Sequence, residues 1–406
     1  MKSIYDLVIV GLGYIGLPTA TIIADKGLKV YGVDLNSGII NLLKNKKTHI
    51  VEPGLEELLN KGIDSGNFNC GVAPVVSSTY LIVVPTPSKK NNEPDVSYVY
   101  KAIDNLLLLL KKGDLCIIES TSPVGTTDSV YKYVIKNRPD LEDTIYFAYC
   151  PERVLPGNIV YELTNNDRVI GGVNKASTEK AVTFYEFFVN GELHKTNSQT
   201  AEMCKLVENA SRDSQIAFAN ELSMICDKAD INVWELIALA NKHPRVNILN
   251  PGCGVGGHCI AVDPYFITSQ YPLESKIINK AREVNNHKAF WCAEKIQNVI
   301  LKFELDNGYK PSVGLFGLAF KPNIDDLRES PAKFIVQRVL QQTNNEKLYI
   351  VEPNLKSHPI FKLTDYKTAA KEVDVLVYLV AHKEFYSLEL SKNQQVLDFC
   401  GITNIY

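Results

Sequence analysis

A glycine-rich turn near the start of the chain constrains the fold more than any other feature. The segment Gly11-Leu12-Gly13-Tyr14-Ile15-Gly16 follows the apolar run 7–10 and opens a stretch with helical periodicity. Glycines at this spacing let the backbone turn tightly and approach a pyrophosphate at the N-terminus of a helix. The order of strand, glycine turn and helix therefore predicts the first βα unit of a parallel α/β sheet that binds a dinucleotide.

An acidic residue after the second apolar run refines the prediction of the cofactor. The run 30–33 ends at Asp34, where a carboxylate would accept hydrogen bonds from the ribose hydroxyls and repel a 2′-phosphate. NAD is therefore favoured over NADP. Pro85, Thr86 and Thr121 follow later strands, at the sheet edge where such folds bind ligands. The alternative is a glycine turn and ordinary loops with no cofactor.

The hydrophobic pattern divides the 406 residues into two α/β ends and a helical middle. We expect two Rossmann-like doubly wound domains joined by a central helical domain with a long helix, with boundaries at 1–198, 199–305 and 306–406. Expected helices cover 200–230, 233–241 and 275–305. Expected strands cover 7–10, 30–33, 81–84, 115–119, 145–149, 313–317, 348–352, 373–380 and 395–398.

Charge and cysteine content exclude several classes of protein. The chain has 43 Lys+Arg against 46 Asp+Glu, so nothing global attracts it to nucleic acid or to an anionic membrane. Its 9 cysteines are an odd number without CxxC pairs, which favours a reduced, cytoplasmic protein. The longest apolar run, 106–110, is far shorter than the roughly 20 residues that span a bilayer.

The segment 251–259 is the most unusual one, because it contains four glycines and ends in Cys259. Closely spaced backbone N–H groups could hold an anion or bring a substrate against the thiol. A buried, inert cysteine is the main alternative. Zinc binding through Cys253, His258 and Cys259 lacks a second ligand pair at a recognised spacing. We therefore expect no metal.

A polar stripe follows one face of the predicted long helix. Lys205 and Asn209 are four residues apart and share a face, with Arg212 and Asp213 near the next turn. The stripe is either solvated, or it lines a cleft and presents an ammonium and an amide group to a reacting oxygen.

Together these motifs resemble the nucleotide-sugar 6-dehydrogenases, which oxidise the C6 alcohol of a UDP-hexose to a carboxylate with NAD. The resemblance extends over essentially the whole chain and implies that this chain is such an enzyme. It is carried by the segments 11–16, 120–126, 150–154, 201–209, 251–263 and 317–321.

Three segments narrow the resemblance to the members that act on UDP-N-acetyl-D-mannosamine, namely 151–157, 241–247 and 256–264. The members that act on UDP-glucose have an aromatic residue at the position of Arg153 and a glutamate at that of Pro156. Arg153 could instead meet the carbonyl group of an acetamido substituent. UDP-N-acetylglucosamine and UDP-N-acetylgalactosamine stay open as alternatives, because the sequence does not distinguish sugar epimers. UDP-glucose is a less favoured alternative.

The family resemblance also implies catalytic roles. Cys259 would hold the sugar as a thiohemiacetal and then as a thioester between two hydride transfers. Lys205 and Asp263 would handle protons, and Lys205 with Asn209 would stabilise the oxyanion. Glu152 would support hydrolysis of the thioester. Thr121 would lie at the nicotinamide and water site.

The remaining implied contacts concern the nucleotide sugar. Arg245 matches an arginine that in relatives reaches the substrate of a neighbouring subunit, which implies a homodimer, and Lys321 matches a residue at the UDP-sugar site. Arg328 could meet a phosphate of the bound ligands. Further expected substrate contacts are Val154, Arg212, His243, Asn247, Gly256 and Phe320.

Two other classes of function also stay open. In a single-step alcohol dehydrogenase, Cys259 would be merely structural. In a non-catalytic NAD-responsive binding protein, there would be no turnover at all.

Overall fold

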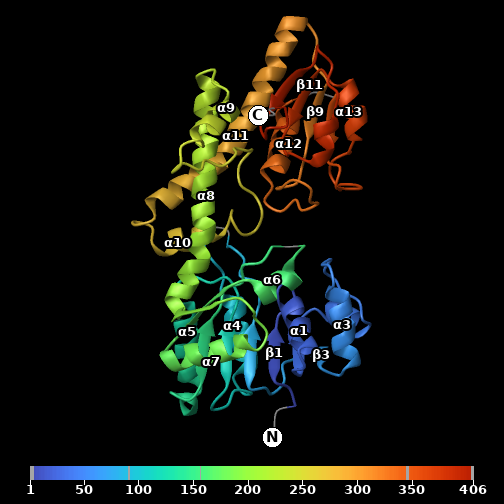
Figure 1. The fold of residues 1–406 in the computed structure, drawn as a ribbon. Helices are drawn as coiled ribbons and strands as arrows, with labels where there is room; N and C mark the ends of the chain where they lie inside the picture. Colours follow the sequence, from blue (N-terminus) through green and yellow to red (C-terminus); the bar gives the residue numbers. More distant parts are fainter. Residues whose placement is uncertain (1–3, 90–91, 156, 344–346, 404–406) are drawn as a thin grey trace. The chain divides into compact units, whose positions relative to one another are not determined.

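The structure is a computed structural model that describes residues 4–89, 92–155, 157–343 and 347–403 (Figure 1). Its contacts divide the chain into two compact units, Met1–Val207 and Glu208–Tyr406. The boundary falls within one long helix, α8 (Ser198–Lys228).

Unit 1 is built on a sheet with the strand order β3-β2-β1-β4-β5-β6-β7-β8. Neighbouring strands are parallel except β6 and β7. The order of β1 to β6 is typical of a dinucleotide-binding sheet, with its reversal between β1 and β4. The strands are β1 (Leu7–Val10), β2 (Val30–Val33), β3 (Phe68–Gly71), β4 (Thr79–Ile82), β5 (Leu115–Ile118), β6 (Tyr146–Tyr149), β7 (Arg168–Gly172) and β8 (Leu193–Asn197).

Helices cover both faces of this sheet, which explains why β1 is apolar throughout. Leu7 and Ile9 pack in one core with α1, α2, α3, α6 and α7, whereas Val8 packs in a second core with α4 and α5. The helices are α1 (Gly16–Asp25), α2 (Ser37–Lys44), α3 (Leu55–Asp64), α4 (Ser97–Leu106), α5 (Thr126–Asn137), η1 (Pro139–Leu141), α6 (Ile159–Asn165) and α7 (Lys175–Glu186).

Unit 2 contains a smaller parallel sheet with the order β10-β9-β11-β12. The helices α11 and α12 pack on one face, and α13 packs on the other. The strands are β9 (Val313–Phe316), β10 (Leu348–Val351), β11 (Val375–Tyr378) and β12 (Gln395–Asp398). The helices are α9 (Val233–Ala240), α10 (Asp263–Gln270), α11 (Lys276–Asn307), α12 (Pro331–Gln342), α13 (Tyr366–Glu372) and η2 (Lys383–Ser387).

Buried polar groups join α8 to α11. Arg282 of α11 forms an ion pair with Asp213 of α8, with 2.6 Å between Nη1 and Oδ1. Asn285 donates to the same carboxylate at 2.8 Å, and Asn220 donates to the Asn285 side chain at 2.9 Å. Asp213 is therefore a structural residue, although it belongs to the polar stripe of the predicted helix.

The predicted fold class is confirmed, since the chain forms two Rossmann-like parallel sheets and a helical region. The strand predicted at 81–84 is shifted, because β4 ends at Ile82 and the chain then enters the proline-containing loop 83–87. The division into three domains stays a prediction, since the contacts divide the chain once. Within the described residues, no helix combines the length and the apolar character that a membrane span needs.

Candidate active site

The glycine turn after β1 has the geometry that a dinucleotide site requires. Gly11 has a φ of +100°, and a Cβ atom there would lie 2.2 Å from the carbonyl oxygen of Val83. A Cβ on Gly16 would lie 1.8 Å from the Gly11 carbonyl oxygen, so the turn closes on itself. Gly13, in contrast, is exposed and a Cβ there would meet nothing within 4 Å, which leaves room for a ligand to approach the backbone.

Asp34 is held at this turn by the backbone. Its Oδ2 accepts a hydrogen bond from the N–H of Leu12 at 3.1 Å, and its Oδ1 accepts one from the N–H of Asn36 at 2.8 Å. The side chain is half-buried at the carboxyl end of β2, beside the reversal of strand order. The arrangement fits an adenine ribose, so the residues present fit NAD.

The other predicted cofactor contacts lie at the same edge of the sheet or start the first helix. Tyr14 is exposed and Ile15 is the N-cap residue of α1. Pro85 is exposed and Thr86 half-buried in the loop after β4. Thr121 is half-buried after β5, next to Ser120, whose hydroxyl accepts a hydrogen bond from the N–H of Val84 at 2.9 Å.

Sequence analysis missed the residue that fixes the loop after Thr121. Glu202, buried in the first turns of α8, accepts hydrogen bonds from the N–H groups of Gly125 at 2.5 Å and Thr127 at 2.7 Å. Burial raises the pKa of this carboxyl to about 7. Glu202 thus connects the helix that carries Lys205 to the loop that carries Thr121.

Glu152 follows β6, and both of its carboxylate oxygens are bonded. Oε1 accepts a hydrogen bond from the N–H of Arg153 at 2.6 Å, and Oε2 accepts one from Nη1 of Arg168 at 2.7 Å. The Arg153 guanidinium donates to the backbone carbonyl of Asp167 at 2.6 Å. Val154 is half-buried. Pro156, where the members that act on UDP-glucose have a glutamate, lies outside the described residues.

The two cysteines of the glycine-rich segment have different environments. Cys253 is buried, and its thiol donates to the Leu379 carbonyl at 3.3 Å. The neighbouring Cys292 thiol and burial raise the pKa of Cys253 well above that of an ordinary thiol. Cys259 is exposed. The geometry therefore leaves Cys259 as the thiol that a substrate can reach.

Cys259 is connected to Asp263 and Asn209. The carbonyl of Cys259 accepts hydrogen bonds from the N–H groups of Val262 at 3.0 Å and Asp263 at 2.8 Å, which starts α10. The side-chain amide of Asn209 donates to Oδ2 of the buried Asp263 at 2.5 Å. Lys205 is half-buried one turn before Asn209, whereas Arg212 is exposed.

Two of the four glycines of this segment pack closely against the chain after β9. A Cβ on Gly256 would lie 2.7 Å from Cβ of Phe320 and 2.6 Å from the Glu329 carbonyl oxygen. Gly257 has a φ of +81°, and its N–H donates to the Arg328 carbonyl at 3.1 Å. These contacts join the Cys259 loop to the segment that carries Lys321.

The loop that carries the exposed Lys321 is anchored by a second residue that sequence analysis missed. Glu352, buried after β10, accepts hydrogen bonds from the N–H groups of Leu318 at 2.7 Å and Ala319 at 3.0 Å. His382 lies 3.1 Å from the same carboxylate. Nδ1 of His382 accepts from the N–H of Asn323 at 3.0 Å, so Nε2 carries the proton and donates to Glu352.

This arrangement repeats that of Asp34 in unit 1, because each acid follows the second strand of its sheet and binds the turn after the first strand. The difference is exposure: Glu352 is buried, whereas Asp34 is half-buried. Although burial alone raises it, His382 and the backbone donors lower the pKa of Glu352. An acid at the end of 348–351 was the sequence signal for this contact.

Four predicted contact residues lie on the surface of unit 2. Arg328 is exposed, and its Nη2 is 2.6 Å from Oδ2 of Asp326 in an ion pair. His243, Arg245 and Asn247 are exposed in the loop after α9. The N–H of Arg245 donates to Nδ1 of His243 at 3.3 Å. The structure thus groups these three residues in one loop.

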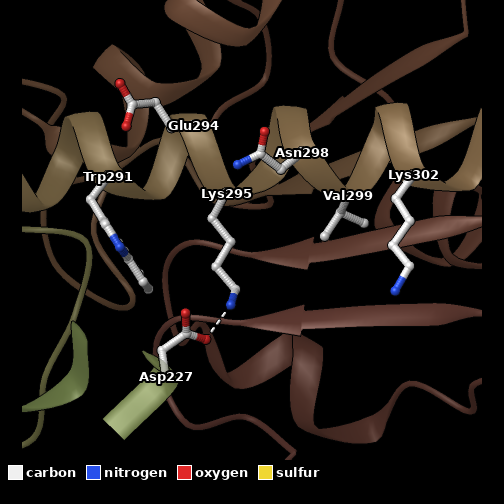
Figure 2. A pocket seen from close by; sticks show the side chains of 7 residues that line it. All are labelled: Asp227, Trp291, Glu294, Lys295, Asn298, Val299 and Lys302. Carbon is white, nitrogen blue, oxygen red and sulfur yellow. Dashed lines mark hydrogen bonds and ion pairs between the residues drawn. The ribbon is translucent and has the colours of Figure 1, made fainter. Parts of the chain in front are cut away.

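A surface pocket lies on the exposed side of α11, apart from the predicted site residues. Figure 2 shows Lys295 directed toward Asp227 of α8, with which it forms an ion pair. The lining residues are Asp227, Trp291, Glu294, Lys295, Asn298, Val299 and Lys302. Among the residues that the structure describes, no cluster of three or more His, Cys, Asp or Glu side chains could hold a metal ion.

The sequence matches one family along most of its length. Residues 5–189 match the NAD binding domain of the UDP-glucose/GDP-mannose dehydrogenase family. Residues 199–287 match its central domain, and residues 314–404 match its UDP binding domain.

Relatives of this family cover nearly the whole chain. The chain is 48% identical to a UDP-N-acetyl-D-mannosamine dehydrogenase from Campylobacter jejuni, over 98% of this chain and 100% of the relative. It is 46% identical to an NDP-N-acetyl-D-galactosaminuronic acid dehydrogenase from Ralstonia nicotianae, over 97% and 95% of the two chains.

A solved structure of a UDP-N-acetyl-mannosamine dehydrogenase from S. aureus has a TM-score of 0.86 to this chain, at 39% identity, and covers 98% of this chain and 99% of that one. The chain therefore belongs to the UDP-glucose/GDP-mannose dehydrogenase family and is an NAD-dependent dehydrogenase with a UDP-sugar substrate.

Proposed function

We propose that this enzyme oxidises UDP-N-acetyl-D-mannosamine to UDP-N-acetyl-D-mannosaminuronate. The choice of sugar is supported by the relatives of that name, which are 46–48% identical over 98% of the chain. Arg153 also supports it, because a guanidinium can donate a hydrogen bond to an acetamido carbonyl. The enzyme works in the cytoplasm as a homodimer, in which the exposed Arg245 reaches the substrate of the other subunit.

One observation supports the chemistry more than any other: the exposed Cys259 is joined through the backbone to Asp263, whose carboxylate binds Asn209 at 2.5 Å. A thiol, a carboxylate and an amide can each assist a four-electron oxidation at one carbon. The thiol keeps the partly oxidised sugar bound, the carboxylate handles a proton, and the amide stabilises the oxygen that becomes negative.

In the first half of the reaction, the C6 alcohol loses its proton to Asp263, with Lys205 or a water as intermediary, and becomes an aldehyde. The Cys259 thiolate adds to the aldehyde and forms a thiohemiacetal. Asn209 and Lys205 stabilise the developing oxyanion. The turn 11–16 and Asp34 would hold two NAD molecules in succession, and each would supply the chemistry of accepting one hydride, the first from the alcohol carbon and the second from the thiohemiacetal carbon.

In the second half, water attacks the thioester on Cys259 and releases the carboxylate product and the thiol. Glu152, with Thr121, supports this water. Glu152 suits the task because its carboxylate is oriented by two donors and its side chain is only 9% exposed. Phe320 and Lys321 bind the nucleotide sugar, together with Val154, Arg212, His243, Asn247 and Gly256.

A second substrate is favoured by a specific observation. The chain is also 46% identical to the dehydrogenase named for N-acetyl-D-galactosaminuronic acid. A dehydrogenase with the same name from Methanosarcina mazei has a TM-score of 0.81 at 27% identity. The alternative is therefore the same oxidation of a UDP-N-acetylgalactosamine or its gluco epimer.

A comparison of sugars tests the proposed substrate. The purified enzyme and NAD are mixed with UDP-N-acetylmannosamine, UDP-N-acetylglucosamine, UDP-N-acetylgalactosamine or UDP-glucose, and the initial rate of NADH formation is measured. The proposal predicts the highest kcat/KM for the manno sugar, with a uronate identified by mass spectrometry. A higher kcat/KM for another sugar overturns the choice of substrate and leaves the chemistry in place.

A further inference from the structure

A buried guanidinium lies beside Glu152 and has no role in the chemistry described so far. Arg168, the first residue of β7, donates from Nη1 to Oε2 of Glu152 at 2.7 Å and from Nη2 to the Leu163 carbonyl at 2.9 Å. Its side chain is 3% exposed. The two bonds fix both ends of the guanidinium fork, so the direction of the Glu152 carboxylate is fixed as well.

A second acid lies in the same cluster. Glu119, at the end of β5, accepts a hydrogen bond from the hydroxyl of Tyr185 at 2.5 Å, and the Arg168 guanidinium carbon lies 5.6 Å from the centre of the Tyr185 ring. Oε2 of Glu119 and Nε of Arg168 are buried without a hydrogen-bond partner among the described residues. Two carboxyl groups therefore share one cation in a nearly dry environment.

Stability alone does not explain this cluster. A buried ion pair gives little net stability compared with apolar residues of the same volume, because both charges must be removed from water. A buried ion pair does fix the orientation and the charge of each of its side chains. These properties matter for Glu152, whose proposed task is to act on a water molecule.

We propose that Arg168 is a positioning residue that orients the carboxylate of Glu152 for hydrolysis of the thioester, with Glu119 and Tyr185 in the same buried cluster. The inference rests on the proposed function, since it deepens the role of Glu152. It assigns a task to residues of β5, β7 and α7 that no motif of the sequence singled out.

The charges around Glu152 agree with this assignment. Burial raises the pKa of Glu119 more than the positive charge of Arg168 lowers it, and the charge of Glu152 adds to the rise. Burial also raises the pKa of Cys150 to about 12, and it raises that of Tyr185 well above its ordinary value. These shifts favour the uncharged forms of the groups that face Arg168, whereas Glu152 is the carboxylate that Arg168 contacts directly, at 2.7 Å.

The test measures the hydrolysis step separately from the oxidation steps. The variants are R168K, which keeps the charge but loses the fork, and R168M, which loses both. Stopped-flow absorbance follows NADH during the first and later turnovers, and intact-protein mass spectrometry measures the fraction of enzyme acylated on Cys259. The sugar is the one that the wild-type enzyme oxidises best.

R138M is the matched control. Arg138 also lies in unit 1 and also donates both to a carboxylate, that of Asp140, and to a backbone carbonyl, that of Leu107. It does not bind Glu152. A general loss of stability would affect this variant as well, whereas a loss of positioning would not.

We expect R168K to keep the rate of the first NADH burst, to slow later turnovers about 10-fold or more, and to accumulate the acylated enzyme. R168M, which loses both the fork and the charge, slows the later turnovers at least as much as R168K does and also keeps the rate of the first burst. In an E152Q background, R168K causes no further loss, because Arg168 acts through Glu152.

Other results overturn the inference. They are an unchanged later rate in R168K, an equal loss in R138M and R168K, or a further loss when R168K is added to E152Q. If R168M does not fold, R168K and the E152Q double variant still decide the question. A wild-type enzyme that forms no NADH with any of the four sugars refutes the proposed function instead, so the two failures are distinguishable.

Discussion

Replacement of Asn209 by Asp tests the geometry of the proposed site with almost no change of shape. The side-chain amide of Asn209 donates to Oδ2 of Asp263 at 2.5 Å, and Asp263 is 4% exposed. In N209D an oxygen takes the place of the donor, so two carboxyl groups face each other. Both can be ionised only against strong repulsion.

The size of the effect follows from the distance. Two unit charges with centres about 4 Å apart repel each other by about 4 kcal/mol at an effective dielectric constant of about 20. This energy corresponds to a rise of about 3 units in the upper apparent pKa of the pair. One proton is therefore shared by the two carboxyl groups up to about neutral pH, and Asp263 cannot take up the proton of the substrate.

The assay is the pH dependence of kcat/KM, measured through NADH formation. The acid limb of this profile is the range in which kcat/KM falls as the pH is lowered. In N209D we expect it to move by about 2–3 pH units toward higher pH. S211D, which adds the same charge to an exposed position of α8, is the control and should leave the limb in place. An unmoved limb in N209D would refute the proton-handling role of Asp263.

The remaining predictions concern the thiol, the cofactor and the stability of the fold. Cys259→Ser should lower uronate formation by about 10³-fold or more, whereas Cys253→Ala should stay within about twofold, as followed by NADH and by mass spectrometry of the product. Asp34→Ala should raise the KM for NAD and the relative use of NADP, because a ribose acceptor and a negative charge are lost; an unchanged NADP/NAD ratio of kcat/KM would contradict its ribose role. Burial raises the pKa of Asp114 from 3.8 to about 6 in the folded state. Because the folded protein binds this proton more tightly than the unfolded chain does, the free energy of unfolding falls as the pH rises from about 4 to 6. In Asp114→Asn the free energy of unfolding should lose this decrease of about 3 kcal/mol, as measured by urea unfolding across the pH range. An equal dependence of the unfolding free energy on pH in both proteins would refute the shift.

Strong local patterns predicted much of the fold. The strands at 7–10 and 30–33 agree with the structure residue for residue, because buried parallel strands are continuous apolar runs. Three strands were not predicted. β3 contains Asn69, β7 begins with the charged Arg168 and ends in two glycines, and β8 exposes His194 and Lys195 at the sheet edge. In these strands tertiary pairing outweighs local propensity.

Local patterns group mainly those candidate residues that are near one another in the sequence. Asp263 follows Cys259 by one helical turn, and Lys205 precedes Asn209 by one turn of α8. The residues that hold the site in place act over long distances in the sequence. Arg168 binds Glu152 across 16 positions, and Glu202 binds Gly125 across 77, so no local pattern indicates them.

The stoichiometry of the reaction is the most direct test of the central claim. A limiting, known amount of UDP-N-acetylmannosamine is mixed with an excess of NAD and enzyme, and NADH is followed to completion. The account predicts two NADH per sugar and a uronate as the product. One NADH per sugar with an aldehyde product would contradict it, since Cys259 would then not carry a thioester.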